Sequence, residues 1–279
     1  GGSCPQGQGM ETIFSQIVAD VWKVEPKDVV MSLADTSGVA MGFGTIASRS
    51  TVTLSGAIHQ ASEPLRQKVF SIAANMLECS AGDLELRNGA VGVVGVPGNE
   101  VTLSTIAKAA RPGWDSARPQ GMAAGLEETA YYEPPTVTWA YAAHAALVEV
   151  DPDLGRVSID KYVIVHDCGT VINPMLVDGQ IHGGAGQGLG ADGQILVGSF
   201  MDYLLPGASD MPHLDLVQMH HPSPLNPLGV KGVGEGSAIA PPAAIANAVC
   251  DALSHLKLEF NETPIKPEKV VRAIWNARR

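Results

Sequence analysis

The spacing of apolar residues along the chain predicts several helices. After Gly9, the residues Ile13, Ile17 and Val21 recur every four positions, which places them on one face of a helix. A longer helical pattern follows Ser50 and ends near Cys79. Shorter helices are predicted at Ser104–Ala110, after Asn173, at Pro241–His255 and at Pro267–Arg278. In the second of these, Asn173-Pro174 has the composition of an N-cap and a first helical residue.

Short apolar runs predict strands. Lys27–Leu33 is typical of a single short strand, and Asn88-Gly89 between two apolar runs indicates a hairpin. Ala145–Val150 and Arg156–Val165 alternate in polarity on either side of the turn sequence Asp151–Gly155. They therefore predict a second antiparallel hairpin.

Two proline-bearing segments without periodicity, Arg111–Pro135 and Pro206–Pro227, are predicted to be loops. Helices and strands both recur without a regular βαβ alternation, so the expected class is α+β, with two lobes of mixed sheets covered by helices. The first loop would separate a lobe of residues 1–120 from a lobe of residues 121–279.

Composition and charge narrow the possible partners. The 279 residues are 45% apolar, enough for one large domain or two lobes. A net charge of −11 argues against binding nucleic acid or an anionic membrane, because such surfaces need clustered Lys and Arg. The four cysteines form no C-x-x-C pair, and no apolar run of membrane-spanning length or signal peptide occurs. A cytoplasmic protein with reduced thiols is therefore expected.

The candidate chemistry lies in four glycine-rich segments: Gly7–Gly9, Gly42–Ser50, Gly179–Gly190 and Gly229–Gly236. Glycine lets a backbone approach a ligand closely, and a loop that leads into a helix offers free N–H groups to an anion. Taken alone, each segment is equally consistent with a tight turn or with close helix packing.

Polar side chains beside the second of these glycine segments favour phosphate. Thr45, Ser48 and Ser50 supply three hydroxyls, and Arg49 supplies a guanidinium, beside Gly44.

The third segment predicts a bare helix face. Gln180 and Gln187 are seven residues apart, nearly on one face of the helix after Asn173, with Gly183 and Gly184 between them. A flat, hydrogen-bonding ligand fits such a face. A small-residue contact between helices is the competing interpretation, and it would leave two glutamines to be satisfied.

Glu235 stands between two glycines in the fourth segment. Taken alone, the position of Glu235 between glycines is explained by a surface turn. Its apolar neighbours, among them Ile239 and Ala240, indicate a partly buried carboxylate, and burial would raise its pKa toward a value suited to a general base.

Histidine and cysteine patterns give no metal site. His166, His182 and the pair His220-His221 lie in different segments without paired spacing, so core or solvent-facing positions are expected. Cys168 is expected to be a small residue near a ligand rather than a nucleophile, because no positive neighbour in sequence lowers its pKa.

In this order, the segments resemble the molybdenum-binding subunit of the xanthine dehydrogenase/aldehyde oxidase/carbon monoxide dehydrogenase family. Gly7–Thr12 looks like a pterin loop of that family, and Gly42–Ser50 is similar to its G-x-G-T-x-x-S-R-S loop. Asp167–Gly169, together with the glycines and glutamines of Gly179–Gly188, resembles the next block. Pro227–Glu235 is the most specific match. The resemblance covers nearly the whole chain, which identifies it as the C-terminal half of such a subunit.

The resemblance implies a molybdenum ion on the dithiolene of molybdopterin, in the cytosine dinucleotide form, without protein ligands to the metal. Glu235 would take a proton from the metal-bound hydroxyl that attacks the substrate; water supplies the oxygen, and electrons leave through iron–sulfur centres. The residues assigned in this way to the cofactor are Gly7, Gln8, Gly9, Gly44, Thr45, Ser48, Arg49, Ser50, Cys168, Asn173, Gln180, Gln187, Lys231, Gly232 and Val233.

The resemblance also implies partners. The family's N-terminal half, with a further pterin loop and most of the substrate pocket, has no counterpart here, and the chain begins at Gly1 without Met. We therefore expect a chain that carries that half, whether through a split gene, processing or truncation. Subunits with [2Fe–2S] clusters and FAD are expected too, in a dimer of heteromers.

Several functions stay open at this point. The substrate is an N-heterocycle or an aldehyde in the favoured interpretation, and carbon monoxide in a second. A non-catalytic structural subunit is a third possibility, against which the acid between glycines at Glu235 speaks. An unrelated phosphate-binding protein is a fourth, and the order of the motifs speaks against it.

Overall fold

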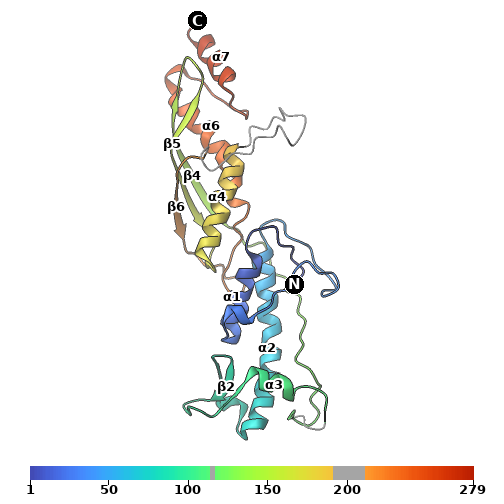
Figure 1. Cartoon of the computed structure of the whole chain (residues 1–279). Coiled ribbons are helices and arrows are strands. Elements are labelled where there is room, and N and C mark those ends of the chain that lie inside the picture. Colours follow the sequence, from blue (N-terminus) through green and yellow to red (C-terminus); the bar gives the residue numbers. More distant parts are fainter. Residues whose placement is uncertain (114–116, 191–210) are drawn as a thin grey trace. The chain divides into compact units, whose positions relative to one another are not determined.

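A computed structural model describes residues 1–113, 117–190 and 211–279. The chain forms two compact units, residues 1–137 with 224–228, and residues 138–223 with 229–279 (Figure 1). The units divide at residues 137/138, whereas the sequence predicted a boundary at 120/121.

The elements of the first unit are α1 (Met10–Trp22), η1 (Pro26–Asp28), α2 (Ser50–Leu77), η2 (Ala81–Asp83), β1 (Leu84–Arg87), β2 (Ala90–Val93), β3 (Glu100–Thr102) and α3 (Leu103–Ala109). Those of the second are β4 (Tyr141–Val150), β5 (Val157–Asp167), α4 (Pro174–Gly190), β6 (Leu214–Met219), α5 (Gly236–Ile239), α6 (Pro241–Ala252), η4 (Ser254–Leu256) and α7 (Pro267–Ala277).

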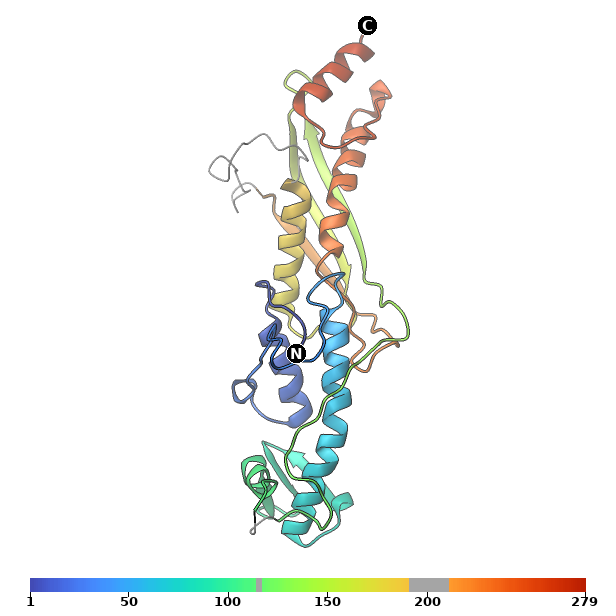
Figure 2. The ribbon, with the colours of Figure 1, turned by 90° about the vertical axis from the view of Figure 1, so that its right-hand side faces the viewer.

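Two helices and a small antiparallel sheet build the first unit. Helix α1 lies beside α2, and the C-terminal part of α2 packs on the sheet β1-β2-β3 and on α3 (Figures 1 and 2). The predicted hairpin at Asn88-Gly89 is confirmed, and both residues have positive φ, 46° and 72°, as a two-residue type I′ turn requires. The predicted helices in this unit are confirmed as well.

The strand predicted at Lys27–Leu33 is wrong. Pro26–Asp28 form a 3-10 turn, and no strand occupies residues 29–33. Burial alternates along the run, with Val29, Met31 and Leu33 half-buried and Val30 93% exposed. Its backbone bonds to the N-terminal residues only at Ser32 and Ala34, and these bonds form no strand pairing. A run this short does not by itself distinguish a strand from a surface segment.

The irregular segment before β4 is held against α2 by polar contacts of Lys68 and Asn75 and by one aromatic ring. The ring of Tyr132 lies so close to Gly56 that a side chain there would collide with it. The hydroxyl of Tyr132 donates a hydrogen bond to the carbonyl oxygen of Leu225 at 3.0 Å. This explains why residues 224–228 belong to the first unit.

A three-stranded mixed sheet forms the second unit's centre. The predicted hairpin is confirmed as β4 and β5, which pair antiparallel with a register shift after Leu147. The prediction that Pro206–Pro227 is entirely a loop is wrong, because β6 pairs parallel with β5, with Leu214 opposite Tyr162. Residues 206–210 of that prediction lie outside the described residues.

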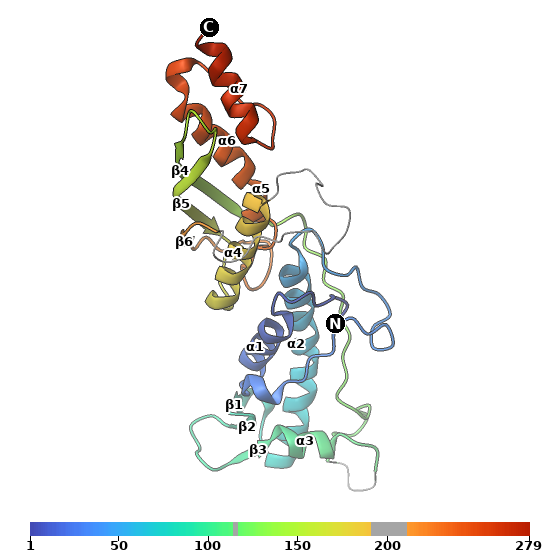
Figure 3. The same ribbon diagram turned by 45° about the horizontal axis from the view of Figure 1, so that its top comes forward.

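Helices α4 and α6 lie on the same side of this sheet (Figures 2 and 3). Tyr162 and Ile164 of β5 are fully buried against Ile181 and Ala185 of α4. Asn173 caps α4 as predicted, since its Oδ1 accepts a hydrogen bond from the N–H of Leu176 at 3.1 Å. The α+β class, with small mixed sheets covered by helices, is confirmed.

Candidate functional site

The two glycine-rich loops of the first unit touch through their backbones. A side chain at Gly2 would stand 2.7 Å from Cα of Gly42. The hydroxyl of Thr45 donates to the carbonyl oxygen of Cys4 at 2.6 Å, and the N–H of Cys4 donates to the same hydroxyl at 3.0 Å. Thr45, which the sequence assigned to the cofactor, therefore joins the two loops, and its donor is already used.

The N-terminus of α2 combines a tight turn with a buried hydroxyl that has no partner among the described residues. Ala47 and Ser48 have positive φ, 53° and 50°, and this turn leads into Ser50, the first residue of α2. Ser50 is 6% exposed, and among the described residues its buried Oγ has no hydrogen-bond partner. The first N–H groups of a helix also lack partners within the helix. The guanidinium of Arg49 lies over the ring of Phe43 at 5.1 Å.

The remaining predicted residues of the first unit line open loops. Gly7 and Gly44 have positive φ, 96° and 67°, and open space where a side chain would be. Gln8 turns its side chain onto its own loop, where its Oε1 accepts a hydrogen bond from the N–H of Gln6 at 2.5 Å. Gly9 is the N-cap of α1 with φ 77°.

In the second unit, a buried ion pair between Asp167 and Lys231 joins the Asp-Cys-Gly turn (Asp167–Gly169) to the segment that leads to Glu235. Asp167 accepts hydrogen bonds from the N–H of Gly169 at 2.8 Å and from Nδ1 of His221 at 2.7 Å. Nζ of Lys231 lies 3.3 Å from Oδ1 of Asp167 and 4.8 Å from the centre of the Tyr141 ring. Both side chains of the ion pair are less than a tenth exposed. Lys231, predicted to bind the cofactor, is thus engaged within the protein.

The charge of Asp167 is stabilised by this network. Burial alone would raise the pKa of Asp167, but the hydrogen bonds from Gly169, His221 and Lys231 outweigh it and hold the pKa below its ordinary value. The two segments are also joined through their backbones, because the N–H of Lys231 donates to the carbonyl oxygen of Cys168 at 2.8 Å.

Cys168, the middle residue of this turn, is 5% exposed. Burial raises the pKa of its thiol, so the thiol stays protonated at neutral pH. A small, inert residue near a ligand is what the sequence predicted for it.

The glycines of α4 serve two different faces. A side chain at Gly184 would meet Ser237, and one at Gly188 would stand 2.8 Å from both Ala238 and Pro241. At these two glycines the competing interpretation, a small-residue helix contact, is correct, and the prediction of a bare face is wrong for Gly184. Gly183, by contrast, is exposed with open space around it.

The glutamines of α4 lie on either side of Gly183. Gln180 is half-buried and Gln187 is exposed. A bare strip therefore exists, but it runs through Gly179 and Gly183 rather than through Gly184.

Glu235 is exposed, and the expectation of a partly buried carboxylate is wrong for this chain. The apolar neighbours that indicated burial do not cover it, since Ile239 is itself 74% exposed. Gly232 is buried and Val233 is partly buried, so the loop emerges from the core just before the acid.

Sequence reasoning missed Asp167 as a structural anchor, and it missed the buried polar atoms of His166 and Ser237. His166 is 1% exposed and neither ring nitrogen has a hydrogen-bond partner among the described residues. Ser237 follows the glutamate loop (Gly232–Gly236) directly in sequence, but no signal in the sequence could have placed His166 beside it, because only the contact of Gly236 with β5 brings His166 there.

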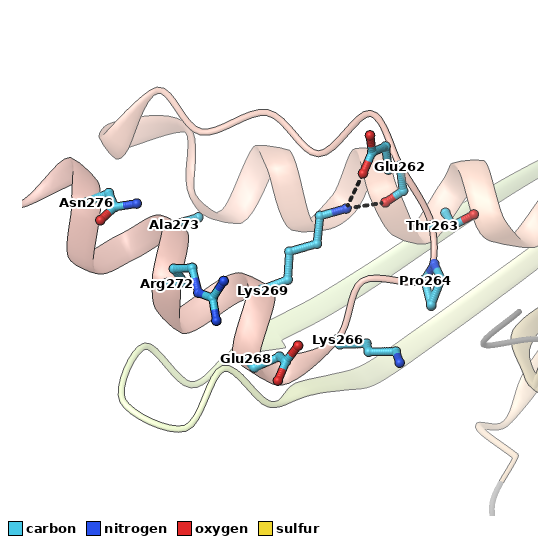
Figure 4. A pocket seen from close by; sticks show the side chains of 9 residues that line it. All are labelled: Glu262, Thr263, Pro264, Lys266, Glu268, Lys269, Arg272, Ala273 and Asn276. Atoms are coloured by element: carbon cyan, nitrogen blue, oxygen red, sulfur yellow. Dashed lines mark hydrogen bonds and ion pairs between the residues drawn. The ribbon is translucent and has the colours of Figure 1, made fainter. Parts of the chain in front are cut away.

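Two hollows on the described surface lie away from these residues. One of about 650 Å³ lies beside α7, where Nζ of Lys269 contacts the carbonyl oxygen of Glu262 at 3.0 Å and its Oε2 at 3.4 Å (Figure 4). None of the predicted site residues lines it. In the described ranges, no three His, Cys, Asp or Glu side chains are grouped as metal ligands would be, and no helix is long and apolar enough to cross a bilayer.

The fold and these loops are those of a molybdopterin-binding protein. Residues 1–212 match the molybdopterin cofactor-binding domain, and the chain belongs to that family. The matched residues include the glycine-rich loops before α1 and α2 and the helix α4, whereas Gly232–Gly236 lie beyond them. The resemblance found in the sequence is confirmed.

Individual relatives agree with this family. The large subunit of nicotine 6-hydroxylase from Paenarthrobacter nicotinovorans is 38% identical over 279 residues, 96% of this chain and 34% of that protein. The solved structure of Cu,Mo-CO dehydrogenase has a TM-score of 0.88 at 32% identity, covering 99% of this chain and 36% of the other. Quinoline 2-oxidoreductase from Pseudomonas putida 86 has a TM-score of 0.86 at 38% identity, covering 98% and 36%. The chain spans about a third of the length of the curated relatives it matches.

Proposed function

We propose that this chain is the cofactor-binding and base-carrying part of a heteromeric molybdenum hydroxylase. The whole enzyme would oxidise an N-heterocycle or an aldehyde, take the oxygen from water and pass electrons to [2Fe–2S] and FAD subunits. The observation that carries the proposal is the family match over residues 1–212, because it includes three of the four glycine-rich segments.

The described residues fit a phosphate-bearing cofactor. The buried, unpartnered Oγ of Ser50 at the N-terminus of α2 is the donor that a phosphate or pyrophosphate oxygen would accept from. Gly7 and Gly44 leave room for close approach of backbone N–H groups, and Gly9 has the positive φ that favours glycine. Ser48 and Arg49 adjoin this site, and Thr45 would hold its two loops together.

The second unit would contribute a flatter surface. Gln180 and Gln187 would hydrogen-bond the pterin or its nucleotide across the bare backbone at Gly183. Cys168, Asn173, Gly232 and Val233 stay in the assignment as residues next to that surface. We propose the cytosine dinucleotide form of the cofactor, as the sequence resemblance implied.

Lys231 would act indirectly. Its Nζ is already bonded to Asp167 and buried, so it would hold the Asp-Cys-Gly turn against the glutamate loop instead of touching the cofactor.

Glu235 would be the general base. When bound, the cofactor supplies the redox chemistry; the chain supplies a carboxylate that accepts the proton of the attacking group. Because the carboxylate is exposed in this chain, substrate and the remaining parts of the enzyme would have to desolvate it.

The substrate class favoured is the N-heterocycle. The relatives named for nicotine and quinoline are each 38% identical, against 35% and 32% for the carbon monoxide dehydrogenase large chains of Afipia carboxidovorans and Hydrogenophaga pseudoflava. A carbon monoxide dehydrogenase type is the second candidate. A non-catalytic structural subunit is the third, and it would not need Glu235.

The partners proposed are a chain or segment with the rest of the molybdenum-binding subunit, an iron–sulfur subunit and an FAD subunit, as a dimer of heteromers. A cytoplasmic location stays a prediction from the sparse cysteines.

Metal and nucleotide analysis of the purified complex tests this function. We expect one molybdenum per copy of this chain, and cytidine nucleotide among the products of acid hydrolysis. Turnover of quinoline or nicotine, but not of carbon monoxide, would support the N-heterocycle. Absence of molybdenum from an intact complex would refute the proposal.

A further inference from the structure

His166 lies directly beneath the loop that carries Glu235. It is on β5, on the face covered by helices, and is 1% exposed. A methyl group at Gly236 would stand 3.0 Å from Nε2 and 3.5 Å from Cδ2 of the His166 ring. The imidazole is therefore in close contact with the residue that follows Glu235 in the chain.

Further polar groups are buried near this imidazole. In the part of the chain that the structure describes, Nδ1 and Nε2 of His166, Nε2 of His144 and Oγ of Ser237 are buried without hydrogen-bond partners. His166 pairs with Ala142 in the β4–β5 register, so His144 is its diagonal neighbour on the same face. Ser237 follows Gly236 directly, and Nδ1 of His144 lies 3.0 Å from the Tyr162 hydroxyl.

Such an arrangement is costly for a purely structural core. Buried polar groups almost always have partners, and one without a partner destabilises the fold, whereas an apolar side chain of similar shape would not. Burial also lowers the pKa of His166, which keeps the ring neutral, with one donor and one acceptor nitrogen.

Before the acid, the loop is anchored by Val230, which bridges to Gly169, and by Lys231, whose backbone and side chain bond to Cys168 and Asp167. Glu235 lies between Gly234 and Gly236, which carry no side chains, and the acid itself is exposed. A base must be held in place, because displacement by about 1 Å can cost a hundredfold in rate. Directly after the acid, at Gly236, the contact with the His166 ring supports the loop.

We propose that His166 is a positioning residue, which sets the place of Gly236 from below and so directs the Glu235 carboxylate. The inference rests on the proposed role of Glu235 as the base. It extends that role to a residue that touches neither substrate nor cofactor.

A double-mutant cycle in the cofactor-loaded complex tests the contact. Gly236→Ala should lower kcat by about tenfold or more, with KM and molybdenum content unchanged, because the added methyl meets the ring and displaces the loop. In a His166→Ala background, where the ring is absent, the same substitution should cost less than about threefold. Gly82→Ala, whose methyl would find only Ser80 Oγ at 3.7 Å, is the control and should change nothing.

Amide hydrogen exchange of residues 232–239 provides a readout besides turnover. Exchange should be faster in His166→Ala and in Gly236→Ala than in the wild type, and the double variant should not be faster than either. His166→Asn, which keeps a polar side chain at this position, should fall between His166→Ala and the wild type in both measurements.

Additive effects of the two substitutions on kcat, or unchanged exchange over 232–239, would overturn the proposal. If Glu235→Gln keeps full turnover while the exchange remains coupled, the base assignment fails but the contact of His166 with the loop stands. If His166→Ala does not assemble, the exchange measured in Gly236→Ala and His166→Asn decides.

Discussion

At the residue scale, the buried pair of Asp167 and Lys231 is costlier to break than an exposed pair. Removing one partner leaves the other charge buried without compensation. The resemblance of Pro227–Glu235 to the molybdenum-binding family assigned Lys231 to the cofactor. It could not show that the side chain turns inward, since its partner Asp167 is 64 positions away in sequence, as the two residue numbers give.

Lys231→Met should therefore lower the free energy of unfolding by about 3 kcal/mol, the lower end for breaking a buried ion pair. Lys161→Met is the matched control, because Lys161 and Asp215 form a 3.0 Å pair that is largely exposed, and its loss should cost less than about 1 kcal/mol. Chemical denaturation followed by tryptophan fluorescence measures both. Equal losses in the two variants would contradict a structural role for Lys231.

The buried histidines predict a pH dependence. Burial lowers the pKa of His166 and of His144 below 6.5, so the unfolded chain takes up the proton more readily than the folded chain. Their contribution to stability is complete above pH 6.5 and is lost as the pH falls from there toward the folded-state values. His166→Asn should flatten the fall in the unfolding midpoint below pH 6.5; an unchanged slope would show that His166 does not contribute to it.

At the scale of elements, local pattern predicted what local structure decides. Helices α1, α2 and α7, the turn at Asn88-Gly89 and the cap at Asn173 each depend on neighbouring residues, and each was predicted correctly. Strand β6 was missed because its partner β5 lies far away in sequence. The exposure of Glu235 and the packing of Gly184 were missed for the same reason, since both depend on where α5 comes to lie.

Substitutions at two glycines of α4 test how this helix packs on α5 and on the start of α6. Gly188→Ala should destabilise the second unit by about 1–3 kcal/mol, because the methyl would overlap Ala238 and Pro241, 2.8 Å away. Gly179→Ala, in the same helix with open space, should instead stabilise it by about 0.5–1 kcal/mol through helix propensity. Thermal unfolding compares the two variants. A stabilising Gly188→Ala would refute the close packing of α4 on the start of α6.

At the scale of the whole molecule, the sequence was most informative where several motifs follow in a fixed order. A single glycine loop is ambiguous, but the ordered set pointed to the family that the match over residues 1–212 confirms. The chain spans about a third of its curated relatives, so substrate, partners and electron path are proposals for the complete enzyme.

The hydroxyl group of Ser50 allows the proposed binding of the cofactor to be tested at one atom. Ser50→Ala should lower molybdenum occupancy of the complex, because it removes the buried hydroxyl at the N-terminus of α2. Ser104→Ala, at an exposed site in α3, is the matched control and should leave occupancy unchanged. Full molybdenum occupancy in Ser50→Ala would show that this hydroxyl does not bind the cofactor.

The most direct test of the account is turnover by Glu235→Gln in the complete, molybdenum-loaded complex, beside Glu259→Gln as an exposed control. We predict unchanged assembly and molybdenum content in both variants, and full turnover in the control. Glu235→Gln should lower kcat by about a hundredfold or more, the size expected when a general base is removed. Turnover near that of the wild type in Glu235→Gln would contradict it.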